Sequence, residues 1–550
     1  MTKIKHTGED FIAQVVEAAE DFCMLAETDK TDKTDSWIGT IGDPDKVSGT
    51  QLPEIFLEAG ALDRICDEAE QALSQQDNLY QRGNLICFSL WNPETNDIAI
   101  KPMTRPGLLR VLSRSATWNR WDERNGQEKL CDPPDRIVSS VFDSQHYPHL
   151  KPLAGIARQP FLRPDDSVVT RSGYDENTKM LAHFDPTQFP IQSTVSISDA
   201  RASLAALNSL LDEFSFADEY DKSAALGAIL TAAIRPSLPV APMFHVRAHQ
   251  VASGKSYLCS LIATFSSGSI PPAASFPTTE EEAQKFLLAT FLEAPPCLIF
   301  DNLTTDIYPY RSLCSALTEP FLSGRILGIS KTATVSTSTL TLSSGNNVSP
   351  VRDMTRRCVT IQLDPKMEIP AEKKYSTDPI KIIRERRGEY VAHALNIIKA
   401  YIQAGSPKTN CKSLASYDRW TGLVRQPLLW LGQSDPATRL FSQLAEDPDR
   451  EYLGRFLELW SENFGTTPKM VREVLQYAND FLPGSRDSAR GELKESLREQ
   501  FEERGDINRR RFGKWLSRKE GQAVGGLRFE KHPGTFSAEK WVLRKNPQDS

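Results

Sequence analysis

The sequence lacks an uninterrupted apolar run of about 18 residues, the length that a membrane-spanning helix requires. Its first residues, MTKIKHTGEDF, lack the apolar core of a signal peptide, so we expect a cytoplasmic protein without a membrane partner. The nine cysteines are scattered and never form C-x-x-C, which argues against a disulfide framework and a cysteine zinc site. Hydrophobic (39%) and charged (25%) residues occur in ordinary globular proportions, and 550 residues suffice for several domains.

Charge is unevenly distributed along the chain. The whole sequence carries a formal net charge of -7, which by itself argues weakly against binding to nucleic acid. The residues from Gly505 onward nevertheless contain 11 Lys and Arg against 5 Asp and Glu. This asymmetry predicts a basic module attached to an acidic body.

The segment Val240–Ser256 (VAPMFHVRAHQVASGKS) combines an apolar strand-like run, an irregular turn and the start of a helical pattern. This order is typical of a phosphate-binding loop, in which free backbone N–H groups at a helix N-terminus hold a polyphosphate. Lys255 would reach the β- and γ-phosphates, and Ser256 would bind Mg²⁺. His249 replaces the first glycine of G-x-x-x-x-G-K-[ST], so a surface turn with a chance GKS is the alternative. The candidate nucleotide contacts are Ala252, Ser253, Gly254, Lys255, Ser256 and Tyr257.

A second motif follows 46 residues after Lys255, where the apolar run Cys297–Phe300 ends in Asp301. A carboxylate at the end of a strand can hold the water shell of Mg²⁺ beside Ser256. Many ring ATPases have a glutamate at the next position, whereas this chain has Asn302, so the general base is open. The two motifs in this order favour a site for ATP and Mg²⁺.

The segments Arg325–Ser330 and Thr337–Ser344 are strand-like, and Lys331–Val335 between them is interpreted as part of a hairpin. The second strand leads to Asn346, 45 residues after Asp301. An amide at the end of a strand suits a sensor that orients the attacking water against the γ-phosphate.

Arg356 and Arg357 follow ten residues after Asn346. An arginine here can reach the nucleotide of a neighbouring subunit, because a guanidinium neutralises the charge of the phosphoryl-transfer transition state. The alternative is a local salt bridge with Asp353.

Other stretches have clear periodicity. Helices are expected over Phe11–Met24, Leu52–Leu73, from Ser198 to Phe214, over Lys222–Ile234, after Thr279, and over Ile382–Ile402. Short β-like runs fill the chain from Tyr80 to about Pro190. Within them, Trp118 and Trp121 either belong to a core or stack on bases.

The C-terminal residues form a three-part basic pattern. Leu493, Leu497 and Phe501 mark a helix closed by Gly505, and Leu527–Glu530 can pair with Trp541–Arg544 across a turn at Pro533-Gly534. Between them, a basic helix carries Arg509, Arg510, Arg511, Lys514 and Arg518. This pattern resembles a winged helix that binds duplex DNA through phosphate contacts. A passive basic domain is the alternative.

The sequence resembles the AAA+ replicative helicases of phages, plasmids and integrative mobile elements. That group is similar to superfamily III and poxvirus-type primase-helicases and to the self-loading helicases of cassette chromosomes. The resemblance extends from roughly Leu79 to the C-terminus and rests on YQRGNL, LAGIARQPFLRPD, GYDENT, LTAAIRPSLPVAPMFHVRAHQVASGKS, LIFDN, GRILGIS, SSGNN-VSPVRDMTRR and YDRWTGLVRQPLLWLGQSDP. The family pattern at the loop is A-P-x-x-G-S-G-K-T, from which His249 and Ala252 depart. Arg352 replaces an expected glycine, whereas Asn302 is usual.

The resemblance implies a multidomain α/β protein with an AAA+ P-loop core. The predicted regions are a helical segment with a polar linker (1–75), an α+β domain (76–197), a helical collar (198–236), the ATPase core (237–365), a helical lid or connector (366–482) and a winged helix (483–550). It also implies an ATP-driven DNA helicase that assembles as a homo-oligomer, a hexameric ring, with single-stranded DNA and Lys331 in its channel.

No primase acid cluster, Toprim pattern or zinc-ribbon spacing is visible, so primers would come from a separate primase. Two alternatives stay open because of His249, Ala252 and Asn302. One is a DNA-binding initiator in which nucleotide controls assembly, and the other is an ATPase used in defence or regulation.

Overall fold

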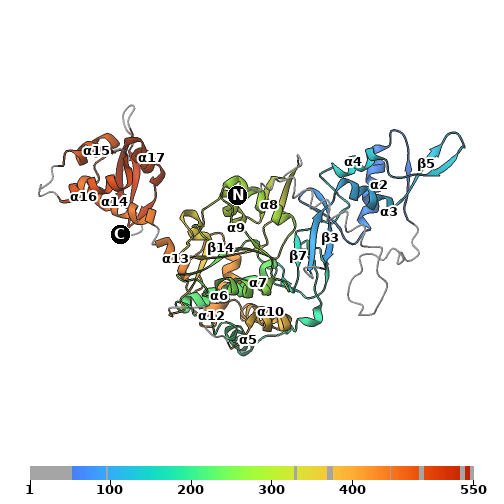
Figure 1. Ribbon diagram of the computed structural model, residues 1–550, viewed down its shortest axis with the longest axis horizontal. Helices are drawn as coiled ribbons and strands as arrows, with labels where there is room; N and C mark the ends of the chain where they lie inside the picture. Colours follow the sequence, from blue (N-terminus) through green and yellow to red (C-terminus); the bar gives the residue numbers. More distant parts are fainter. Residues whose placement is uncertain are drawn as a thin grey trace, which may run out of the picture. The chain divides into compact units, whose positions relative to one another are not determined.

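The computed structural model describes residues 52–93, 97–326, 331–367, 376–445, 448–481, 488–503, 505–532 and 539–545 (Figure 1). It is a mixed α/β structure, as predicted, in which several small sheets accompany one larger parallel sheet. In these ranges no helix is both long and apolar enough to cross a membrane. The predicted helix Phe11–Met24 lies outside the described residues.

The largest sheet has five parallel strands in the order β13-β14-β17-β12-β18. Both of its faces are buried, since Phe244 and Val246 of one strand enter one hydrophobic cluster and Met243 enters another. The strands are β12 (Met243–Ala248), β13 (Ala273–Ala274), β14 (Cys297–Leu303), β17 (Leu340–Asn346) and β18 (Cys358–Leu363). Because they run in one direction, their carboxyl ends share one edge, where ligands of such sheets bind.

Helices distant in sequence surround this sheet. They are α5 (Ile197–Ser209), α6 (Glu219–Ile234), α7 (Lys255–Ser266), α8 (Glu280–Leu292), α9 (Arg311–Thr318) and α10 (Pro379–Gln403). Among them, α6 and α7 contact the strands of the sheet, α10 packs on α5, α6 and α7, and α8 packs on α9. In Figure 1 the orange α10 lies beside the green α7, and the two helices are in contact. The helix α6 is alanine-rich and buried on nearly all sides, which suits a core helix rather than a surface one.

The helix starts test the capping predictions. Thr279 caps α8 through the backbone N–H of Glu282, but the Glu282 carboxylate accepts from Thr278 N and Oγ1, so the capping box that Thr279 and Glu282 predict is only half formed. The cap of α5 is Ser196, two residues before the predicted Ser198. Ser196 forms a capping box with Asp199, and this reciprocal pair satisfies two backbone donors at once. Ser198 has no such partner three residues on.

The hairpin predicted around residue 331 is formed by other strands than the predicted ones. β15 (Phe321–Arg325) pairs antiparallel with β16 (Thr332–Ser336), while β17 belongs to the large sheet. The segment after Lys331 is therefore a strand rather than the turn. Its period-two pattern explains this, because Ala333 and Val335 are buried while Thr332 and Thr334 are exposed.

The N-terminal described region contains two three-stranded sheets, β1-β5-β6 and β2-β3-β4. Its elements are β1 (Glu54–Leu57), α2 (Leu62–Ser74), β2 (Leu79–Arg82), β3 (Leu85–Asn92), β4 (Asp97–Pro102), α3 (Arg105–Ser115), β5 (Thr117–Asp122), β6 (Gln127–Leu130) and α4 (Asp135–Phe142). The helix predicted over Leu52–Leu73 is thus wrong at its start. Residues 54–57 pair in parallel with β5, a contact that no local pattern reveals.

The two tryptophans in β5 have different surroundings. Trp118 is buried and donates from its indole nitrogen to Leu112 O. Trp121 is 53% exposed. Core packing therefore accounts for Trp118 alone. Smaller strands follow, namely β7 (Gly155–Ala157), β8 (Phe161–Leu162), β9 (Val168–Val169), β10 (Gly173–Asp175) and β11 (Met180–Ala182).

After α10 come α11 (Asp418–Trp420), a π-helical turn (Thr421–Arg425), α12 (Gln426–Trp430) and α13 (Thr438–Ala445). The remaining elements are α14 (Pro448–Phe464), β19 (Lys469–Met470), α15 (Val471–Asn479), α16 (Ser488–Phe501), β20 (Glu502–Glu503), β21 (Asp506–Ile507), α17 (Arg509–Lys519), β22 (Ala523–Val524), β23 (Leu527–His532) and β24 (Lys540–Lys545).

The C-terminal elements share one hydrophobic cluster. The predicted pairing of Leu527–Glu530 with Trp541–Arg544 is confirmed within β23 and β24, whereas Pro533-Gly534 lies outside the described residues. Phe456 and Trp460 of α14 belong to the same cluster as Phe512 of α17. The core around α17 therefore also includes α14, which lies well before residue 483.

Candidate nucleotide site

The loop between β12 and α7 carries the predicted phosphate-binding residues. Gly254 precedes α7 with φ = +84°, a region that glycine enters without strain. Ala252 replaces the glycine of the family pattern and also has a positive φ, +58°. A residue with a Cβ is strained there by roughly 1 kcal/mol, so the loop keeps its left-handed bend at a small cost in stability.

Lys255 begins α7, and only 7% of it is exposed. Its Nζ donates to Gln250 O at 3.3 Å, which places the ammonium group over its own loop. Burial lowers the pKa of Lys255, and the nearby Asp301 carboxylate opposes that change. A buried ammonium at a helix N-terminus is suited to bind a phosphate.

Ser256 and Asp301 meet as predicted. Ser256 Oγ donates to Asp301 Oδ1 at 2.7 Å, and Ser344 Oγ of β17 donates to the same oxygen. The loop helix, β14 and β17 thus supply three oxygen-bearing side chains at one point. Hard oxygen ligands of this kind are the ones that Mg²⁺ prefers.

Asn302 lies at an irregularity of β14. The pairing of β14 with β17 shifts register between Phe300 and Leu303, and Asn302 has φ = +56°. Asparagine is one of the residues that adopt this region most readily. The backbone N–H of Asn302 donates to Ser344 Oγ at 3.1 Å. This contact is made by the backbone, so a catalytic part for the side chain stays a prediction.

Asn346 ends β17 directly opposite Ala248, the last residue of β12. Its side-chain Oδ1 is buried and has no hydrogen-bond partner among the described residues. A buried amide oxygen without a partner costs free energy unless a ligand or a water supplies one. The predicted sensor amide is therefore adjacent to the loop and able to accept another hydrogen bond.

A polar relay that no sequence motif indicates joins the loop to two strands. Arg247 donates to Gln362 Oε1 from Nε and Nη2 (3.2 and 2.9 Å), which orients the amide of Gln362. Gln362 Nε2 then donates to His249 Nε2 at 2.9 Å. His249 must carry its proton on Nδ1, which lies 2.9 Å from Asn347 Oδ1. The histidine in the glycine position thus connects the loop with the residue after Asn346.

Aromatic rings lie beside the loop. A Cβ placed on Gly254 would be 3.9 Å from the ring of Phe214, and the rings of Phe214 and Tyr257 are 6.0 Å apart. Tyr257 donates to Asp378 Oδ1, the N-cap of α10. Phe214 also lines an open groove of about 430 Å³. Tyr257 is one of the predicted nucleotide contacts, and its hydroxyl group is bound to the start of α10.

The two predicted finger arginines both pair with Asp353. Burial alone would raise the pKa of Asp353, but hydrogen bonds from Arg356 and Arg357 outweigh burial and lower it. The side chain of Arg356 is 45% exposed, whereas that of Arg357 is 8% exposed. Arg356 is consequently the member of the pair with an accessible guanidinium. Arg352, in the expected glycine position, has φ = +54°.

Lys331, predicted to face DNA, contacts the end of α4 instead of open solvent. Its Nζ lies 2.9 Å from both Asp143 Oδ1 and Phe142 O, and 4.1 Å from the centre of the Phe142 ring. Only 12% of the side chain is exposed. Lys331 must leave Asp143 before it can contact a phosphate.

The basic helix of the C-terminal region is α17. Phe512, Trp515 and Leu516 are buried in the cluster of that region, so the opposite face is directed outward. The exposed basic residues are Arg509, Arg510, Arg511, Lys514 and Arg518. Three arginines in a first turn oppose the positive end of the helix dipole. Such a placement is unfavourable for stability and suits a role in binding an anion.

No protein-family model and no curated protein matches this chain. Among solved structures, the apo form of the C-terminal region of NrS-1 aligns with 10% identity and a TM-score of 0.34, covering 83% of this chain and 96% of that one. A structure of JCV Helicase with a bound small molecule aligns with 11% identity and a TM-score of 0.21, covering 42% and 68%. At these TM-scores the likeness does not define a shared fold.

Proposed function

We propose that this protein is an ATPase of the AAA+ helicase type that uses ATP hydrolysis to move along DNA. The observation that carries the proposal is the meeting of Ser256 and Asp301 at the edge of a parallel sheet, beside Asn346. The sequence predicts three separate motifs, namely a phosphate loop, an acidic strand end and a sensor amide. All three lie at this edge of the sheet. Convergence of this kind is expected of a nucleotide site and not of a chance GKS turn.

Each residue has a distinct part in the proposed reaction. Lys255 would neutralise the β- and γ-phosphates, and Asn346 would orient the attacking water through its amide. Ser256 and Asp301 would hold Mg²⁺, which neutralises charge on the transferring phosphoryl group when bound. The groove lined by Phe214 would receive the base. No side chain is assigned as the general base.

The proposal of an oligomer rests on the arginine pair Arg356 and Arg357. An exposed Arg356 held by Asp353 suits a finger that acts on the nucleotide of the next subunit, so we propose a homo-oligomeric ring, a hexamer by resemblance. The helicase would take single-stranded DNA into the channel, near Lys331, and bind duplex with the exposed face of α17, in a winged helix. Its role would be replication of a phage or mobile element, with primers from a separate primase.

A second function is favoured by one observation. Two charged groups of the site already have partners within the chain, because Lys255 is held by Gln250 and Asp301 by two serines. A nucleotide would have to replace these contacts when it binds. Such a rearrangement suits an initiator, or a regulatory or defence ATPase, in which nucleotide binding controls assembly. The two functions differ in turnover.

Turnover with DNA separates the two functions. ATP hydrolysis by the full chain should be measured with and without single-stranded DNA, alongside particle images. The proposal expects rings and a rate that rises on adding DNA. Rings that form with ATP but do not turn it over would favour the assembly function.

A further inference from the structure

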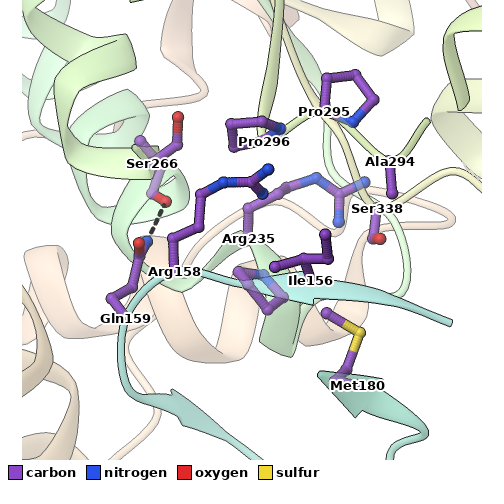
Figure 2. A pocket seen from close by; sticks show the side chains of 12 residues that line it. Ile156, Arg158, Gln159, Met180, Arg235, Ser266, Ala294, Pro295, Pro296 and Ser338 are labelled. Atoms are coloured by element: carbon purple, nitrogen blue, oxygen red, sulfur yellow. Dashed lines mark hydrogen bonds between the residues drawn. The ribbon is translucent and has the colours of Figure 1, made fainter. Parts of the chain in front are cut away.

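A small enclosed cavity lies between the region of β7 to β11, α6 and the start of β14, away from the nucleotide loop (Figure 2). The centre of a water-sized particle can occupy about 10 Å³ of it, so the cavity has room for one small ion or one water molecule. Two guanidinium groups, Arg158 and Arg235, border it, and both side chains point into the same space in Figure 2. Most of the remaining lining is aliphatic, from Ile156, Met180, Ala232, Pro236, Ala294, Pro295 and Pro296.

Arg158 is only partly satisfied. Its Nε donates to both oxygens of Asp97 at 2.6 and 2.7 Å, and its Nη2 donates to Ile98 O. The residue is 8% exposed, and its Nη1 is buried and has no partner among the described residues. This nitrogen carries two N–H donors, so the border of the cavity has donor capacity without an acceptor.

Positive charge also exceeds negative charge at this place. Arg235 is 2% exposed and donates to the carbonyls of Leu238, Thr337 and Thr339. Burial lowers the pKa of Arg235 to about 9, which reflects the cost of holding this charge away from water. Of the described residues that line the cavity, none is acidic.

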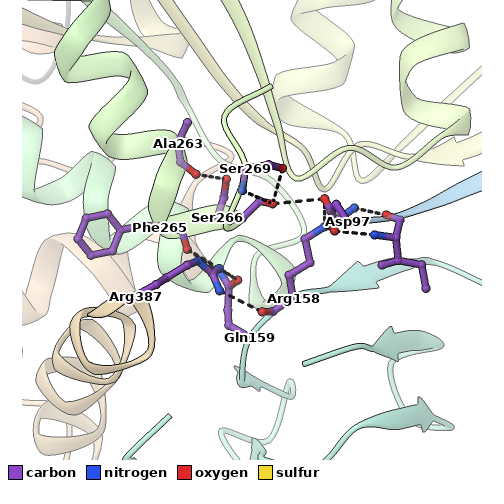
Figure 3. A network of polar contacts seen from close by, with 10 residues as sticks. Asp97, Arg158, Gln159, Ala263, Phe265, Ser266, Ser269 and Arg387 are labelled. Carbon is purple, nitrogen blue, oxygen red and sulfur yellow. Dashed lines mark hydrogen bonds and ion pairs between the residues drawn. The ribbon is translucent and has the colours of Figure 1, made fainter. Parts of the chain in front are cut away.

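The surrounding network uses its acceptors on other donors. Figure 3 shows Arg158 between Asp97 and the end of α7. There Arg387 donates to Phe265 O and to Gln159, and Ser266 Oγ donates to Ala263 O. Ser338 Oγ accepts from Ser336, which leaves its own O–H available to donate. The groups facing the cavity are therefore mainly donors and aliphatic carbons, and Ser266 Oγ, whose proton is used on Ala263 O, is left as an acceptor.

We propose that this cavity is a binding site for a monovalent anion of the size of chloride, held between Arg158 and Arg235. An anion accepts several N–H donors at once and needs no acceptor in return. A water molecule in the same place would need acceptors for its two protons, and the lining offers few. The bound anion offsets the excess charge where the end of α7 meets the strands around Arg158, and so it stabilises that packing.

The test is thermal unfolding of the full chain in potassium chloride and in potassium gluconate at equal ionic strength. Chloride at about ten times its dissociation constant should raise the unfolding temperature of this region by about 2 °C. Crystals grown or soaked with bromide should show an anomalous peak in contact with Arg158 Nη1.

Two variants distinguish this site from general salt effects. Arg158→Gln removes the donor and should abolish the chloride dependence. Arg163→Gln is its match, because Arg163 is also paired with an aspartate, donating to Asp175 from Nε and Nη2, but does not line the cavity. This control should keep the full dependence. Should Arg158→Gln not fold, the bromide peak in the unaltered chain decides.

Three outcomes overturn the proposal. Equal unfolding temperatures in both salts would mean that the cavity holds water only. The absence of a bromide peak at Arg158 would mean the same. A chloride dependence that persists unchanged in Arg158→Gln would place the ion elsewhere.

Discussion

Ser256 Oγ and Asp301 Oδ1 are joined by a hydrogen bond of 2.7 Å across 45 residues of sequence. The bond ties the first turn of α7 to the carboxyl end of β14. Both atoms are of the kind that binds Mg²⁺, and Lys255 lies one residue away. The pair therefore defines the centre of the proposed site, and substitutions on either side should have the same consequence.

Lys255→Ala and Asp301→Ala should each abolish ATP hydrolysis, and the double variant should be no worse than either. One removes a phosphate contact and the other the metal position, and residues that act as a unit are not additive. Hydrolysis rates and circular dichroism of the purified variants check this. Wild-type turnover in either folded variant would eliminate this site.

Arg356→Ala should lower hydrolysis by about 10³-fold or more while leaving the fold intact, because its guanidinium is accessible. Mixed with Lys255→Ala subunits, it should regain activity at mixed interfaces. Arg357→Ala is the matched variant. It should instead lower the free energy of unfolding by about 2 kcal/mol, since that side chain is buried and bonded to Asp353. Mixed rings that form without any recovery would refute the finger.

Asp143→Ala should release Lys331 and strengthen binding of single-stranded DNA, with resting ATP hydrolysis unchanged. Lys331→Ala should also spare resting hydrolysis but impair unwinding. Fluorescence anisotropy with a labelled oligonucleotide measures the first effect. Asp67→Ala, which removes a surface partner of His149, is a control that should change neither. An Asp143→Ala affinity equal to that of wild type would show that Asp143 does not restrain Lys331.

Neutralising Arg510 and Lys514 should weaken duplex binding and reduce its salt slope by about 0.9 for each DNA phosphate that the protein no longer neutralises. These residues are exposed on α17, so the fold should persist. Point substitutions are preferable to a truncation near residue 483, which would uncover Phe456 and Trp460 of α14. An unchanged salt slope would show that α17 does not bind the DNA backbone.

Motifs and elements with a strong local pattern could be predicted from the sequence. The periodic stretch Ile382–Ile402 lies within α10, and Cys297–Asp301 lies within β14. The pairing in β23 and β24 could also be predicted, because an alternating run (Leu527–Glu530) and an apolar run (Trp541–Leu543) flank Pro533-Gly534 in the sequence.

Features that depend on distant partners could not be predicted. Residues 54–57 are a strand only because β5 pairs with them, and β16 takes its register from β15. The relay through Gln362 and His249 joins residues 113 positions apart. The only indication of the relay in the local sequence is His249 in place of a glycine. This substitution identifies an unusual position, but it does not indicate that Gln362 and Asn347 are its partners.

Unwinding tests the central claim most directly, that hydrolysis at Lys255 and Asp301 drives movement on DNA. A fork with a single-stranded tail should be mixed with the full chain, and strand separation followed with and without ATP. We expect separation that requires ATP and is abolished in Lys255→Ala. ATP turnover by the wild-type protein without any strand separation, under conditions in which it binds the fork, would contradict the account.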